Sequence, residues 1–82
     1  MKTPHELAQT GETVTETMKV LVDGQAQPRE VRVRWLTKNQ PVPEGWFFVQ
    51  DWQGLVQILD DKDLALEARS RVNAAKGFMG GR

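Results

Sequence analysis

The chain has 82 residues, 11 basic and 11 acidic side chains, a formal net charge of zero, one histidine and no cysteine. This length fits one small domain, 1–82, whose single core gives only modest stability. The missing cysteines exclude disulfides, cysteine-ligated zinc and thiol nucleophiles, and zero net charge argues against a strong non-specific polyanion binder. There is no long apolar run, and the N-terminus lacks the apolar core of a signal peptide. We therefore expect a cytoplasmic protein that does not span a membrane.

The N-terminal segment begins with a helix-start pattern. Thr3 can cap the helix, Pro4 suits the first helical position and Glu6 follows the cap by three residues. Gly11 can end the helix. The pattern predicts a short helix with only two apolar anchors, and so short a helix is marginal unless it is packed. A flexible segment over 1–12 is the alternative.

Two alternating stretches follow. Residues 13–22 alternate between apolar and polar side chains and are rich in Thr and Val, which indicates a strand. Residues 30–36 alternate again, and we expect the two strands to pair antiparallel. Asp23-Gly24 is a turn signal. We expect residues 25–28 to lengthen this connection beyond a two-residue loop.

The most apolar segment is 46–52, which contains four of the six Trp and Phe residues. Strict strand alternation cannot hide all of these rings on one face. The segment is therefore either a central strand covered on both sides or, in part, a docking surface. Alternation would place Trp46, Phe48 and Trp52 on one face, and the sequence leaves open which face is exposed.

The remaining elements are a fourth strand and a long helix. Gln53-Gly54 makes a tight connection to an apolar strand over 55–59. Acidic residues at the start and basic residues at the end of 61–76 suit the two ends of a helix dipole, and apolar residues recur there at helical spacing. We expect Gly77 to end this helix and 78–82 to form a flexible tail.

Together these elements predict an α+β fold. It consists of an antiparallel sheet of three to four strands, a C-terminal helix packed on one face and a short N-terminal helix. The expected core consists of Val20, Val22, Val31, Val33, Trp35, Phe47, Val49, Ile58, Leu64, Ala68 and Val72.

Catalytic and metal-binding patterns are missing. His5 is a single histidine in a helix-start segment, which cannot build a typical zinc site. Ser70 lies in the predicted helix without the Gly-x-Ser-x-Gly context of a nucleophile. The aspartates in 60–63 lack the glycine and terminal glutamate of a calcium loop, so helix capping explains them better. We therefore expect a protein that is not an enzyme and has no cofactor and no metal.

The first functional hypothesis is protein binding. Trp, Phe and Arg are the residue types that anchor interfaces. We expect Trp46, Phe48 and Trp52 to form the contact surface, with Arg32 and Arg34 at its rim. The module would bind another protein and modulate it, and a homodimer would be a second way to hide the exposed rings.

The alternative hypothesis is nucleic-acid binding. Basic side chains interleaved with aromatic rings on a sheet can hold phosphates and stack bases. The residues proposed for this role are Arg32, Arg34, Lys38, Arg69, Arg71 and Lys76.

Two short resemblances accompany these hypotheses. The order of a short helix, antiparallel strands and a C-terminal helix is similar to the double-stranded-RNA-binding domain. That family has a Lys-rich start to its last helix, where this chain has the acidic 60–63. Separately, Val42-Pro43-Glu44-Gly45-Trp46 resembles a tract of small phage accessory proteins, which implies a phage or mobile-element accessory protein that modulates a host protein.

Overall fold

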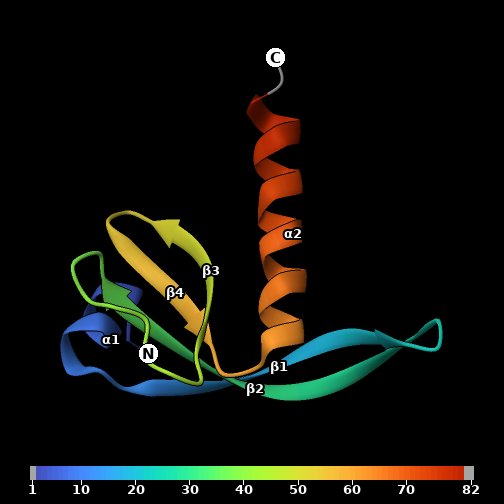
Figure 1. The fold of residues 1–82 in the computed structure, drawn as a ribbon, viewed down its shortest axis with the longest axis horizontal. Helices are drawn as coiled ribbons and strands as arrows, with labels where there is room; N and C mark the ends of the chain where they lie inside the picture. The colour runs from blue at the N-terminus through green and yellow to red at the C-terminus, as the bar shows by residue number, and fades with distance from the viewer. Residues whose placement is uncertain (1, 81–82) are drawn as a thin grey trace.

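The computed structural model describes residues 2–80, with side chains as far as Ala75. The elements in chain order are α1 (Pro4–Thr10), β1 (Thr13–Val22), β2 (Gln25–Thr37), β3 (Phe47–Trp52), β4 (Leu55–Leu59) and α2 (Lys62–Gly80) (Figure 1). The four strands form one antiparallel sheet in the order β1-β2-β4-β3. The predicted α+β fold is confirmed.

The helix α1 has the predicted cap at each end. The Thr3 hydroxyl accepts a hydrogen bond from the Glu6 N–H (3.2 Å), and the Glu6 carboxylate accepts one from the Thr3 N–H (3.0 Å). Gly11 adopts a left-handed φ of 75°, and its N–H donates to the Leu7 carbonyl at 2.9 Å. Leu7 and Ala8 are buried, and α1 contacts β2 and β4. The predicted short N-terminal helix is therefore present, and it packs against the sheet.

A tight turn joins β1 to β2. Val22 lies opposite Gln25, and the two residues between them have positive φ values of 53° (Asp23) and 81° (Gly24). The predicted longer connection over 25–28 is wrong, because these residues belong to β2. Pro28 is tolerated there because this part of β2 pairs with β1 alone, so one side of the strand needs no ladder hydrogen bond.

The β1–β2 hairpin extends beyond the rest of the sheet. The strand β4 pairs with β2 only over Val33–Thr37, whereas β1 pairs with β2 along its full length. We call the protruding part, Thr17–Glu30, the arm. Figure 1 shows the arm reaching out past the base of α2, with α2 standing away from the sheet.

The strand β3 lies at the edge of the sheet, so the predicted alternative of a central strand covered on both sides is wrong. It also carries a β-bulge. Phe48 lies opposite Ile58 and Gln50 opposite Gln57, which leaves Val49 as the extra residue.

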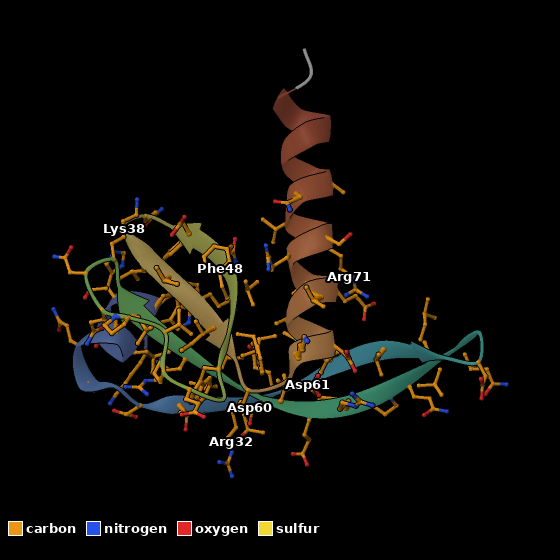
Figure 2. All side chains as sticks on the ribbon, viewed as in Figure 1. Arg32, Lys38, Phe48, Asp60, Asp61 and Arg71 are labelled. Atoms are coloured by element: carbon orange, nitrogen blue, oxygen red, sulfur yellow. The ribbon has the colours of Figure 1, made fainter. Side chains whose placement is uncertain are left out.

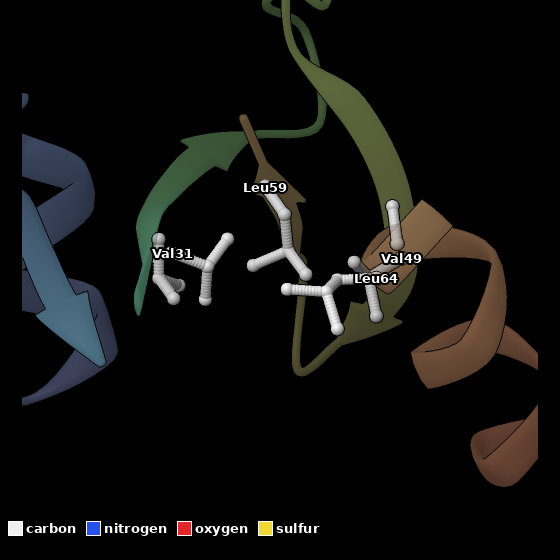
Figure 3. Close-up of a cluster of buried hydrophobic side chains, with 6 residues drawn as sticks. Val31, Val49, Leu59 and Leu64 are labelled. Carbon is white, nitrogen blue, oxygen red and sulfur yellow. The ribbon is translucent and has the colours of Figure 1, made fainter. Parts of the chain in front are cut away.

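One hydrophobic cluster holds α2 to the sheet (Figure 3). It consists of Val31, Val33, Val49, Leu59, Leu64 and Ala65, with Met18, Val20, Trp35, Phe47 and Ala68 packed against it half-buried. Ile58, Leu36, Leu55, Leu7 and Ala8 are also buried. Most of the predicted core is therefore confirmed, whereas Val22 and Val72 are only half-buried and lie outside the cluster.

The helix α2 begins at its predicted cap and runs further than predicted. The Asp61 carboxylate accepts a hydrogen bond from the Leu64 N–H at 3.0 Å. The predicted end at Gly77 is wrong, because the helix continues to Gly80. Glycine permits a left-handed helix end but does not require one, and within a helix it costs only about 1 kcal/mol. The predicted tail is thus helical over 78–80, and residues 81–82 lie outside the described part of the chain.

Candidate functional site

The three predicted contact rings do not share a face. Phe48 lies opposite Ile58 and Trp52 lies opposite Leu55. Directly opposed residues point to the same face of a ladder, and positions three apart on one strand point to opposite faces. Phe48 and Trp52 therefore point to opposite faces, because the bulge at Val49 shifts the alternation by one residue.

Trp52 belongs to a separate aromatic cluster. Its ring lies 5.8 Å from the Trp35 ring and 5.9 Å from the His5 ring, measured between centroids, with tilted planes. The Trp52 residue remains 37% exposed. The cluster connects the end of β3 with β2 and α1, and no such ring contact could be read from the sequence.

Trp46 and Phe48 instead line a hollow between β3 and one flank of α2. We call it the aromatic hollow. Its volume is about 260 Å³, and it is lined by Val42, Trp46, Phe47, Phe48, Lys62, Ala65, Leu66 and Arg69. Two of its apolar residues are strongly exposed, Val42 at 41% and Leu66 at 50%. A turn positions the first ring, with the Trp46 N–H donating to the Pro43 carbonyl at 3.2 Å.

Arg69 completes this hollow. Its guanidinium carbon lies 5.5 Å from the centroid of the Phe48 ring, within cation–π range. Figure 2 shows Phe48 beside α2. The sequence suggested Arg69 only as a phosphate contact, because the helix register that brings it over Phe48 depends on how α2 packs against β3.

The predicted rim residues do not reach the hollow. Arg32 points away from α2 on the opposite side of the sheet (Figure 2). Arg34 is half-buried, and its Nε has no hydrogen-bond partner within the described residues. Neither side chain lines the hollow.

The basic residues proposed for nucleic-acid binding are dispersed. Arg71 pairs with Glu67 at 2.7 Å, and Arg69 covers the Phe48 ring. Lys38 lies in the β2–β3 connection, far from Arg32 in Figure 2, and the side chain of Lys76 lies outside the described part. The proposed basic residues with described side chains therefore do not gather at one place, and nucleic-acid binding stays a prediction.

A larger hollow lies on the other flank of α2, and the sequence did not reveal it. We call it the α2–arm groove. Its volume is about 480 Å³, and it is lined by Thr17, Met18, Lys19, Val49, Gln50, Gln57, Leu59, Leu64, Glu67, Ala68, Arg71 and Val72. The Gln50 amide donates to the Gln57 side chain at 2.7 Å within it. The groove forms where the arm and the base of α2 diverge, a geometry that local sequence patterns do not show.

Three carboxylates have structural roles that lower their pKa values. The pKa of Asp61 is held below its ordinary value by the backbone hydrogen bond from Leu64 and by the Arg29 side chain. The pKa of Glu6 is lowered by hydrogen bonds from Thr3, and that of Glu12 by the Lys2 side chain. In this part of the chain, no three His, Asp or Glu side chains gather as metal ligands, and neither helix has the length and apolarity needed to cross a membrane.

Comparison of the chain with protein-family models, curated proteins and solved structures finds no match. A functional proposal therefore depends on the two apolar hollows that flank α2.

Proposed function

We propose that this chain is a small, non-enzymatic module that binds another protein through the aromatic hollow. The observation that supports the proposal is the placement of Arg69 over the Phe48 ring beside two exposed aliphatic side chains, Val42 and Leu66. Aromatic rings and arginine dominate the binding energy of protein interfaces when they line a pocket that a partner can fill. Trp46 supplies the second ring of this hollow.

The size and charge of the hollow define the partner segment. A volume of about 260 Å³ accommodates one or two apolar side chains rather than a cofactor. Lys62 and Arg69 are the charged residues in its lining, and both are basic. The partner segment should therefore present an aromatic or aliphatic anchor next to an acidic residue.

The proposal is tested by selecting peptides from a displayed random library on the immobilised protein. The best peptide is then titrated against the wild type and against Leu66→Glu and Trp46→Ala. Leu66 is half exposed and Trp46 precedes β3, so both variants should keep the fold. We expect each substitution to weaken binding about tenfold or more, as loss of an interface anchor does.

The matched control is Leu21→Glu, because Leu21 is 68% exposed on the arm and remote from the hollow. This variant should bind the peptide like the wild type. Equal binding by all variants, or a selection that yields no peptide, would count against the aromatic hollow as a binding surface. Circular dichroism of each variant separates lost binding from lost folding.

A further inference from the structure

The α2–arm groove is larger than the aromatic hollow and distinct from it. Its walls come from β1 on one side and from α2 on the other. Met18 supplies apolar surface on the arm, and Leu64, Ala68 and Val72 supply it on the helix. The apolar positions of α2 follow i, i+4 spacing, so they form one stripe along the helix.

Beyond the groove, residues 73–75 of α2 are exposed. The helix contacts β3 and β4, and the principal contacts of the arm are between its own two strands. At helical spacing, the stripe of Leu64, Ala68 and Val72 continues to Ala75. A helical segment that projects into water is marginally stable by itself, so a structure that docks against this stripe would stabilise it.

The groove flank of α2 carries one negative and one positive charge, so it is complementary to the same flank of a second copy. Glu67 and Arg71 both line the groove, one helical turn apart, and they pair with each other at 2.7 Å. In an antiparallel pair of helices related by a two-fold axis, the same flank of both helices meets. Such a pairing centred between positions 67 and 71 brings Glu67 against Arg71 of a second copy, and Arg71 against Glu67 of that copy.

We propose that the groove binds α2 of a second copy of this chain, in antiparallel orientation, to form a two-fold symmetric dimer. Position 64 of one copy then faces position 74 of the other, and the C-terminal end of each helix reaches the arm of its partner. The opposed helix dipoles also favour this orientation. Both grooves are filled by one symmetric interface, and each copy keeps its aromatic hollow free.

The test uses two charge reversals and their mixture. Glu67→Arg places two cations on the flank, and Arg71→Glu places two anions there. Each variant alone should self-associate about tenfold more weakly than the wild type in sedimentation equilibrium, because like charges then meet across the interface. An equimolar mixture should recover wild-type affinity, because each cationic pair then meets an anionic pair.

The mixture isolates the contact between copies. Both single variants also lose the ion pair within their own helix, and mixing cannot restore that pair, so recovery reports only intermolecular contact. Val72→Glu should also weaken the dimer, since it places a charge in the apolar stripe. Leu66→Glu lies on the opposite flank of α2 and should leave self-association unchanged.

Three results would overturn the inference. In the first, the wild-type protein stays monomeric at millimolar concentration. In the second, the mixture of the two charge reversals associates no better than either variant alone. In the third, Leu66→Glu disrupts the dimer but the charge reversals do not. The last result would move self-association to the aromatic hollow. Peptide binding by the hollow is measured separately, so its failure and the failure of this dimer remain distinguishable.

Discussion

At the scale of single residues, Asp61 connects the helix to the arm. Its carboxylate accepts a hydrogen bond from the Leu64 N–H at 3.0 Å and one from the Arg29 guanidinium at 3.2 Å. The cap could be predicted, because an aspartate directly before a helical pattern is a local signal. The contact with Arg29 could not, because those two residues are 32 positions apart in the sequence and meet only after β2 and β4 pair.

Replacing Asp61 should therefore lower the stability of the domain. We expect Asp61→Ala to reduce the free energy of unfolding by about 1 kcal/mol, the usual cost of losing a helix cap. Asp61→Asn should retain most of the stabilisation that the cap provides, because asparagine also caps helices. Urea denaturation at neutral pH measures both changes. Asp63→Ala is the control, and a loss as large as that of Asp61→Ala would contradict the capping role.

The same residue predicts a dependence on pH. Folding lowers the pKa of Asp61, so its contribution to stability is fully present above the pKa of an unfolded aspartate, about 4, and is lost as the pH falls through the lower folded pKa. The wild type should lose more unfolding free energy than Asp61→Asn below about pH 4. Denaturation midpoints recorded through this acidic range should converge for the two proteins, and parallel curves would refute the prediction.

At the scale of elements, the bulge in β3 decides which side chains form the candidate site. The boundaries of β4 and β1 followed from alternation and turn residues. A bulge is one extra residue, and Val49 has no feature that distinguishes it from its apolar neighbours. Alternation therefore placed Trp52 with Phe48, whereas the structure places it with Trp35.

The tip of the arm, 21–26, should respond independently of the rest of the fold. Gly24 has a φ of 81°, which strains any residue with a Cβ, so Gly24→Ala should destabilise the hairpin by about 1 kcal/mol. The effect should appear as faster amide exchange over the tip, because these residues pair only within the hairpin. Amides of β4 should change little. Uniform acceleration across the sheet would show that the tip is not an independent unit.

At the scale of the whole molecule, the fold class and most of the core were predictable because they depend on local periodicity. The sheet order, the protruding arm and the two hollows were not, since they depend on contacts between distant segments. The roles of the basic residues of α2 were also not predictable from the sequence. The basic residues after Glu67 suggested phosphate contacts, but Arg69 lies over Phe48 and Arg71 pairs with Glu67. We accordingly expect no salt-sensitive binding of a generic oligonucleotide, which fluorescence titration at low and high salt would check.

If the two flanks of α2 serve different interfaces, site-specific photo-crosslinking should distinguish them. A photoreactive phenylalanine analogue is placed in turn at Leu66, in the aromatic hollow, and at Val72, in the α2–arm groove. We expect a covalent dimer of this chain from position 72, and from position 66 an adduct with the selected peptide but no dimer. A dimer from position 66, or none from position 72, would contradict this expectation.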